Sequence, residues 1–346
     1  MKYPDTEANL EHAKSLTPSE IRSIEFYTGW LPDRIVDAHA HSGEESTSQN
    51  AKVPQKNLRH MSSTYLHFPI ERSRQFDSLF HPGKKITRIR FAKVQRGLSQ
   101  SATNQYLLSR YSKSDRMAAF GMKEDLEGTI RVLSDPRCCA LKMYYLYCEP
   151  TAETILDTFP PELLEACQDL EKPIILHLPK PLLKSFDDLI SVLRNFPTLK
   201  VSLAHLGLHM VDDARLDEAF KKLVPFDNVN LDTALNISKE VFARALKAMG
   251  PCRIMYGTDE PINLLRFNVF RHPEKGERIV SDRLYHWADH EEHATYSQKF
   301  SDFRHSHWLA LDAARHAIET VPNAQGTEAT KELIFEQNAV SFFGLS

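Results

Sequence analysis

The sequence contains no apolar run long enough to span a bilayer, which takes about 20 residues, and it has no cationic surplus. Its 43 lysines and arginines face 46 aspartates and glutamates, giving a formal net charge of −3. Nucleic-acid-binding domains usually carry a clustered positive excess. The polar first residues also lack the apolar core of a signal peptide. We therefore expect a cytoplasmic protein that binds neither nucleic acid nor membrane.

Glycine and cysteine are also scarce. Only 12 of the 346 residues are glycine, and no glycine-rich phosphate loop follows the first apolar run, which argues against a dinucleotide-binding fold. The five cysteines include no Cys-x-x-Cys pair, and their odd number and irregular spacing do not indicate a disulfide framework. We expect them to be buried packing residues.

Short apolar segments, rich in β-branched residues, alternate with amphipathic helical patterns. The segments lie at 34–39, 116–122, 138–145, 172–178, 200–206, 228–232 and 253–259. An eighth candidate, 86–94, is weaker because its alternating charges also fit a helix or an edge strand. The later segments recur about every 25 to 35 residues, the length of a βα unit. This pattern predicts an α/β fold, either an open doubly wound sheet or a closed (β/α)₈ TIM barrel.

The domain organisation follows from the same pattern. Residues 1–30 are interpreted as a helical N-terminal extension and residues 31–346 as the barrel domain. Two long polar insertions interrupt the alternation, at 43–97 after the first strand and at 260–304 after the last. Both would emerge at the C-terminal face of a barrel, where active sites lie, and long insertions commonly form lids.

Two His-x-His pairs occur, His39 with His41 and His305 with His307. Residues two apart in a strand point to the same side, so the first pair can converge on one metal ion. The second pair lies in a helical pattern, where residues two apart do not face each other. We interpret the second pair as surface or lid residues rather than metal ligands.

Other polar side chains interrupt or close the apolar strands at the same end. They are Lys142, His177, His205 and Asp259. Each alone is most simply a satisfied core group, but burying unpaired charges or imidazoles costs roughly several kcal/mol. Five strand ends with such groups therefore favour a metal site. Imidazole and carboxylate ligands suit Zn²⁺, with Mn²⁺ and Fe²⁺ as alternatives.

With these residues the sequence resembles the amidohydrolase superfamily, and in particular its amidohydrolase-related branch of metal-dependent (β/α)₈ hydrolases and decarboxylases. The segments LEACQDLEKPIILH and NAVSFFGL are similar to that branch, and the resemblance covers roughly residues 34–345 outside the insertions. It implies one or two metal ions. The implied ligands are His39 and His41 on the first strand, Lys142 on the fourth, His177 on the fifth, His205 on the sixth and Asp259 on the eighth.

The resemblance also implies catalytic roles. Asp259 would bind the metal, take a proton from the attacking water and return it to the leaving group. The residue matching His205 binds a second ion in binuclear members, and in single-metal members it polarises the substrate or activates the water. Lys142 would be carboxylated in a binuclear site, because a bare ammonium would repel a cation. The alternatives are that Lys142 pairs with Asp259 or binds an anionic substrate.

The segment ALKMYY is similar to the corresponding strand of dihydroorotases. Those enzymes carry an arginine soon after the second histidine, whereas here Ser42, Gly43 and Glu44 follow. This difference argues against dihydroorotate as the substrate.

Candidate substrate contacts follow the predicted strand ends or lie in the last insertion. They are Tyr144, Tyr145, Lys180, His209 and Arg271. Phenolic and cationic groups suit a small carboxylate-bearing substrate, although each residue is alternatively a solvated loop residue or a packing aromatic.

We expect a metal-dependent hydrolase that activates water to cleave an ester, lactone or amide. The rival is a non-oxidative decarboxylase of an aromatic or unsaturated acid with one metal ion. A third interpretation is a non-catalytic binding barrel. Assembly into a homo-oligomer is compatible with the sequence.

Overall fold

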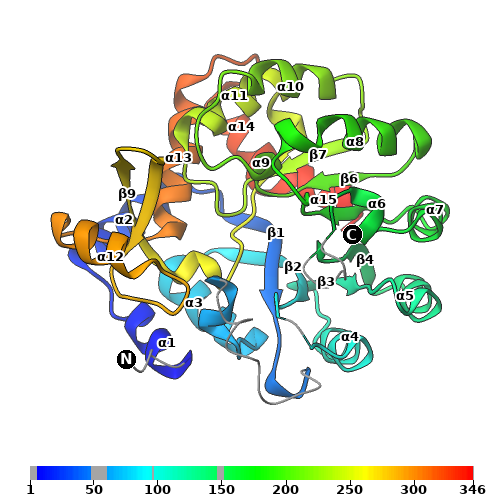
Figure 1. Ribbon diagram of the computed structural model, residues 1–346, viewed down its shortest axis with the longest axis horizontal. Helices are drawn as coiled ribbons and strands as arrows, with labels where there is room; N and C mark the ends of the chain where they lie inside the picture. Colours follow the sequence, from blue (N-terminus) through cyan, green and yellow to red (C-terminus); the bar gives the residue numbers. More distant parts are fainter. Residues whose placement is uncertain (1–5, 48–60, 96, 146–151, 346) are drawn as a thin grey trace.

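In the computed structural model, which describes residues 6–47, 61–95, 97–145 and 152–345, a parallel sheet curls into a barrel covered by helices (Figure 1). Its eight strands are hydrogen-bonded in chain order. They are β1 (Arg34–Ser42), β2 (Lys85–Ala92), β3 (Asp115–Phe120), β4 (Cys138–Lys142), β5 (Ile174–Leu176), β6 (Val201–Leu203), β7 (Val229–Asp232) and β8 (Ile254–Met255). The predicted TIM barrel is confirmed.

Backbone hydrogen bonds between β1 and the segment that begins with β8 close the barrel. They run from the Ala38 N–H to the Tyr256 carbonyl (2.8 Å), from the Asp259 N–H to the His39 carbonyl (2.9 Å), and from the His41 N–H to the Glu260 carbonyl (2.7 Å). The pairing of β1 with β2 shifts register between Asp37 and Ala40. Such irregularities re-aim side chains, and this one coincides with His39.

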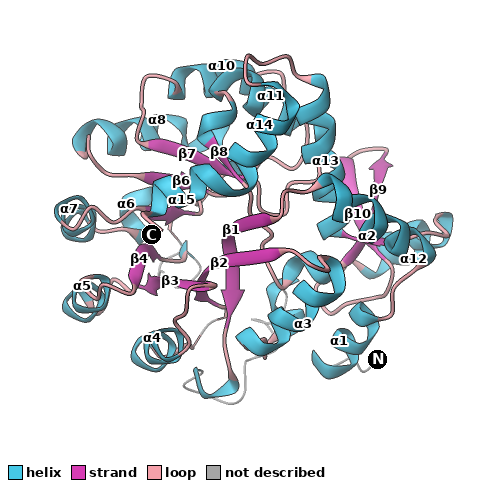
Figure 2. Cartoon of the chain, turned by 180° about the vertical axis from the view of Figure 1, so that it is seen from behind, coloured by secondary structure: helices cyan, strands magenta, loops and turns pink. Residues whose placement is uncertain are grey.

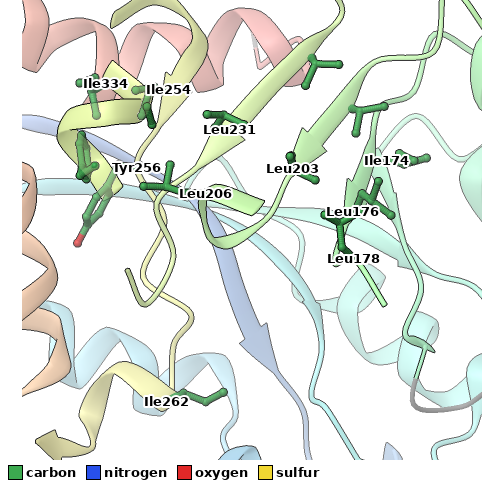
Figure 3. Packing of buried hydrophobic residues seen from close by; sticks show 14 of the residues in the cluster. Ile174, Leu176, Leu178, Leu203, Leu206, Leu231, Ile254, Tyr256, Ile262 and Ile334 are labelled. Carbon is green, nitrogen blue, oxygen red and sulfur yellow. The ribbon is translucent and has the colours of Figure 1, made fainter. Parts of the chain in front are cut away.

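Helices separate successive strands and cover the barrel. They are α3 (Ile70–Phe80), α4 (Gln100–Ser109), α5 (Leu126–Leu133), α6 (Ile155–Thr158), α7 (Pro161–Asp169), α8 (Leu182–Asn195), α9 (His205–Leu208), α10 (Leu216–Leu223), α11 (Lys239–Met249) and α13 (Ser306–Thr320). Their apolar faces pack on the strands, and Figure 3 shows Leu203, Leu231 and Ile254 of this core. No helix in the described part of the chain is long and apolar enough to cross a bilayer.

The C-terminal residues continue as a helical segment. It comprises α14 (Gly326–Glu332), a π-helical turn (Leu333–Gln337) and α15 (Asn338–Phe343). Phe342 and Phe343 join a second buried cluster that contains Val36 of β1 and Met255 of β8, and Figure 2 shows α15 from behind the barrel. The last helix of the chain therefore packs against both strands at the barrel seam.

The first insertion is shorter than predicted, because β2 lies within residues 43–97. The arginines of β2 gave this segment a charged pattern that is typical of surface residues, but their side chains are buried in ion pairs. Arg90 lies 2.9 Å from Asp115 and 3.0 Å from Glu260, and Arg88 pairs with Asp37. The insertion thus ends before residue 85, and its described part contains a 3₁₀ turn (Met61–Tyr65) and α3.

The second insertion forms a small antiparallel sheet in the order β10–β9–β11. Its strands are β9 (Arg266–His272), β10 (Gly276–Ser281) and β11 (Arg304–His305), and α12 (His290–Tyr296) lies between β10 and β11. Figure 1 shows β9 and α12 on the same side of the barrel as the N-terminal helices α1 (Thr6–Lys14) and α2 (Pro18–Trp30). These two helices occupy the predicted N-terminal extension.

The prediction that His305 and His307 lie on the surface is wrong. Both side chains are buried, because His305 lies beside Glu20 of α2 and the His307 ring packs against Phe80 and His81 at the end of α3. His305 Nδ1 lies 2.6 Å from a carboxylate oxygen of Glu20, and His307 Nδ1 lies 3.3 Å from the Asn263 amide. They belong to the packing of the insertion.

The cysteines follow the prediction in part. Cys138, Cys139 and Cys167 are buried free thiols, whereas Cys252 is exposed, which contradicts the expectation for that residue. It lies in the turn that follows α11. Cys148 lies outside the described residues.

Candidate metal centre

Three of the predicted ligands meet at the barrel seam. One ligand atom from each of His39, His41 and Asp259 lies within 4.8 Å of the others, and all three side chains are buried. The Asp259 Oδ1 atom is 3.0 Å from His41 Nε2 and 3.3 Å from His39 Nε2. Gly257 permits this approach, because a Cβ atom there would lie 2.9 Å from the His39 Cβ.

Two more imidazoles adjoin this group. The His205 ring centroid lies 4.8 Å from that of His39, and the His177 centroid lies 5.1 Å from that of His205. His205 and Asp259 both have left-handed backbone conformations, with φ of 57° and 60°. Such conformations cost about 1–3 kcal/mol in non-glycine residues and cluster at functional sites.

In all four imidazoles, the Nδ1 atom lies within hydrogen-bonding distance of an acceptor oxygen of the protein. His41 Nδ1 lies 2.7 Å from the Ala92 carbonyl, His177 Nδ1 3.0 Å from that of Leu178, His205 Nδ1 2.8 Å from that of Ala234, and His39 Nδ1 3.1 Å from an Asp232 carboxylate oxygen. Because these oxygens only accept, the hydrogen of each neutral ring belongs on Nδ1. Every Nε2 then presents a lone pair, as a metal ligand requires.

The neutral rings fit a cation. Burial lowers the pKa of His41, lowers that of His177 well below its ordinary value, and lowers that of His205 to about 4. The Nε2 lone pairs of His39 and His41 then face a carboxylate oxygen of Asp259, which is repulsive unless a proton or a metal ion lies between them. Burial raises the pKa of Asp259, but when a proton lies on these nitrogens, their hydrogen bonds to Asp259 outweigh burial and hold its pKa well below the usual range.

Asp232, at the end of β7, was not predicted as a site residue. Its carboxylate is fully buried and accepts hydrogen bonds from the backbone N–H groups of His205 (3.0 Å) and Ala234 (3.2 Å) as well as from His39. Burial lowers the pKa of His39, but the charge of Asp232 and the hydrogen bonds to Asp232 and Asp259 together outweigh burial and raise it. A carboxylate in this position fixes the tautomer and orientation of a ligand histidine.

Replacing Asp232 with Asn is expected to weaken Zn²⁺ binding about 10- to 100-fold. The amide NH₂ would face His39 Nδ1 and favour the Nε2–H tautomer, which has no lone pair for a metal. Competition with a chromogenic chelator measures the affinity. Asp227→Asn, exposed just before the same strand, is the matched control, and equal affinities in both variants would show that Asp232 does not orient His39.

Lys142 is buried at the end of β4, and its ammonium group has no hydrogen-bond partner among the described residues. The Nζ atom lies 5.0 Å from the ring centroid of Phe91 and 5.5 Å from that of Tyr144. Burial lowers the pKa of Lys142 to about 8, although the charges of Asp232 and Asp259 oppose this. A lysine with this pKa is partly neutral near pH 8, as carboxylation by CO₂ requires.

A cleft of about 780 Å³ opens onto these groups, and His177, His205 and Asp259 line it. Its other walls come from the segment after α9, the start of α11 and the second insertion. From the insertion come Phe267, Val269, Glu277, Arg278, Ile279, Val280, Trp287 and Glu292. A volume of this size is typical of a small-molecule site.

The two predicted tyrosine contacts lie beside the imidazoles. The Tyr144 hydroxyl is buried, donates to the Ala92 carbonyl and lies 3.1 Å from His41 Nδ1. Tyr145 is half-buried, and its ring stacks on His177 with centroids 5.1 Å apart.

The predicted cationic contacts are more dispersed. Lys180 is paired with Glu153, His209 Nε2 accepts a 3.4 Å hydrogen bond from the Leu183 N–H, and Arg271 is exposed on β9. None of the three is among the cleft-lining residues described, whereas Arg278 on the adjacent strand is. Their contact with a substrate stays a prediction.

Comparison with solved structures reveals the same fold in distant proteins. An amidohydrolase from Burkholderia multivorans with bound zinc is 12% identical, with a TM-score of 0.58 over 90% of this chain and 99% of that one. A probable 2-pyrone-4,6-dicarboxylic acid hydrolase from Acinetobacter baumannii is 13% identical (TM-score 0.52; 90% and 99%). The 5-carboxyvanillate decarboxylase from Sphingomonas paucimobilis is 13% identical (TM-score 0.52; 91% and 100%).

No curated protein matches the sequence. The sequence model of the amidohydrolase family, in contrast, matches residues 36–345. This match spans the whole barrel, from β1 to the last helix, and it includes every residue of the candidate metal centre. The chain therefore belongs to the amidohydrolase family.

Proposed function

We propose that this protein is a metal-dependent hydrolase that cleaves an ester, lactone or amide bond of a small carboxylate-bearing molecule. The observation that carries the proposal is the set of four imidazoles whose Nδ1 atoms are all held by acceptors, beside the Asp259 carboxylate. His39, His41, His177 and Asp259 would hold a divalent ion, with Zn²⁺ preferred. Such an ion acidifies a bound water and polarises a carbonyl group.

The residues of the chain then have distinct tasks. Asp259 lines the cleft beside the imidazoles, which supports the proposal that its carboxylate accepts the proton of the attacking water and passes it to the leaving group. His205 keeps its Nδ1 hydrogen on the Ala234 carbonyl. Its Nε2 atom can therefore accept a proton or bind a second ion, but it cannot donate a hydrogen bond to a substrate carbonyl while the ring is neutral.

The proposed site has two possible forms, which differ in the chemical state of Lys142. As a carbamate it would bridge two metal ions, with His177 and His205 holding the second. As an ammonium it would balance the buried Asp232 and Asp259 charges or bind the substrate carboxylate. Metal equivalents per chain, together with the mass of the Lys142 peptide, distinguish the two forms.

The second candidate is a non-oxidative decarboxylase of an aromatic or unsaturated acid. Within the described residues, His39, His41 and Asp259 form one group whose ligand atoms lie within 4.8 Å of one another, which suits a one-metal site with an unmodified Lys142. The similarity to a 5-carboxyvanillate decarboxylase agrees with this candidate. The similarity to a pyrone hydrolase agrees equally well with the first candidate.

Metal analysis and a substrate panel test these proposals together. We expect at least one equivalent of metal in protein purified without chelators, and turnover of esters, lactones or amides that a chelator abolishes and Zn²⁺ restores. Release of CO₂ from aromatic acids without hydrolysis would favour the decarboxylase. Protein that binds no metal and turns over nothing would overturn both and leave a binding barrel.

Metal binding is also expected to stabilise the fold. A ligand that binds only the folded state at about 100 times its Kd adds roughly 2.7 kcal/mol to the free energy of unfolding. Thermal unfolding of chelator-treated protein, with and without added Zn²⁺, measures this without a substrate. Mg²⁺, which prefers oxygen ligands, is the control and is expected to shift the midpoint less.

A further inference from the structure

Large apolar side chains are exposed at the mouth of the cleft. The described part of the chain exposes eight large hydrophobic residues, and three of them line this one cleft: Met210 (39% exposed), Val211 (44%) and Val269 (45%). Exposed apolar residues that gather at one concave place mark a binding surface, whereas isolated ones carry no such meaning.

These three residues come from separate elements. Met210 and Val211 follow α9, the short helix that begins at His205. Val269 lies on β9 of the second insertion. Leu208, Phe267 and Trp287 also line the cleft, and they are less exposed. Apolar side chains from the segment after α9 and from the second insertion therefore line the same cleft as residues of the candidate metal centre.

Two charged groups of the insertion wall, Arg278 and Glu292, pair with each other. Arg278 lies 3.5 Å from Glu292, and Glu292 is also paired with Lys275. A cleft of about 780 Å³ is also at the upper part of the range for small-molecule sites, about 300–1,000 Å³. Beyond the place for the reacting end of a substrate, this cleft therefore also offers space bordered by exposed apolar side chains.

We infer that the substrate carries a medium-length hydrocarbon portion, which lies between Met210 and Val211 on one element and Val269 on the other while its reacting carbonyl group faces Asp259. This inference rests on the proposed hydrolase function, which it makes more specific. Burial of the hydrocarbon removes from water the apolar surface that the empty cleft exposes, and each buried methylene then strengthens binding.

Binding of straight-chain hydroxamic acids, from acetohydroxamic to decanohydroxamic acid, tests the inference by calorimetry on Zn²⁺-loaded protein. The hydroxamate end chelates a metal, so acetohydroxamic acid reports the metal centre and chain length reports the cleft walls. We expect the affinity to rise about three- to fourfold per methylene until the chain passes the cleft mouth. Primary alcohols of the same lengths should give a similar slope without chelating metal.

Val269→Asp and Met210→Asp should each weaken the binding of octanohydroxamic acid at least about tenfold, which is the effect of losing two or more buried methylenes. The affinity for acetohydroxamic acid should stay unchanged. Val224→Asp is the matched control, because Val224 is 46% exposed and lies away from the cleft lining. Affinities that do not rise with chain length, or a slope unchanged by both cleft variants, would overturn the inference. Failure of acetohydroxamic acid to bind would instead overturn the metal centre, and the alcohol series would still measure the cleft.

Discussion

Asp259→Asn is expected to lower kcat/KM by about 10²- to 10⁴-fold, the usual contribution of a positioned proton-transfer group. Asparagine has nearly the shape of aspartate but cannot accept the proton of the attacking water. The backbone at this position is left-handed, with φ of 60°, a conformation that asparagine tolerates better than other non-glycine residues. The substitution therefore separates the chemistry of Asp259 from its structural role.

Steady-state kinetics on the first substrate from the panel measures this loss, and metal analysis of the same preparation measures retained metal. Most of the metal is expected to stay, because the histidine ligands are intact. Asp187→Asn, which changes an exposed aspartate of α8, is the control and should match the parent protein. An Asp259→Asn protein as active as the parent would rule out proton transfer through this residue.

Glu20→Gln is expected to lower the free energy of unfolding by about 3–5 kcal/mol, as breaking a buried ion pair does. Both Glu20 oxygens lie 2.9 Å from nitrogens of Arg266, at the start of β9, and Glu20 also accepts the His305 N–H (2.9 Å). The Arg266 guanidinium would keep its hydrogen bond to the Ser15 carbonyl (2.6 Å) but would lose the carboxylate charge that neutralises it. Urea unfolding measures the change, and Glu25→Gln, exposed on the same helix, controls for the loss of a helix charge.

The same ion pair predicts how stability depends on pH. Burial raises the pKa of Glu20, but hydrogen bonds from His305 and Arg266 outweigh burial and lower the pKa far below its ordinary value. A depressed carboxyl pKa stabilises the fold fully above the unfolded-state pKa of about 4.3, and this contribution is lost as the pH falls further. The gap between the parent and Glu20→Gln should therefore narrow between about pH 5 and pH 3. A gap that stays constant over this range would contradict the assignment.

The sequence predicted the later strands well for a physical reason. Parallel strands β4 to β8 are buried on both faces, so they appear as continuous apolar runs. The same reasoning made β2 the weaker strand candidate, because two arginines interrupt its apolar pattern. In the structure these arginines are neutralised by carboxylates of β1, of β3 and of Glu260. Those partners are up to 170 residues away in the sequence, and no local pattern reveals them.

The sequence also indicated which polar groups would lie together in the candidate site. His39, His41 and Asp259 could be identified as candidate ligands because each polar group closes an apolar strand, and their side chains meet in the structure. Asp232 closes the segment 228–232 in the same way, so the signal for it was present and was overlooked. The burial of His305 and His307 could not be predicted, because the residues around them are distant in sequence: Glu20 for His305, and Phe80 and His81 for His307.

The way in which the imidazoles are held bears on how the family could diversify. His41, His177 and His205 are oriented by main-chain carbonyls of Ala92, Leu178 and Ala234, and every amino acid supplies such a carbonyl. The side chains at those three positions can therefore change during evolution without disturbing the orientation of these imidazoles, whereas His39 relies on one particular carboxylate. New specificities can accumulate around this centre at little risk to it, with Asp232 as the position least free to vary.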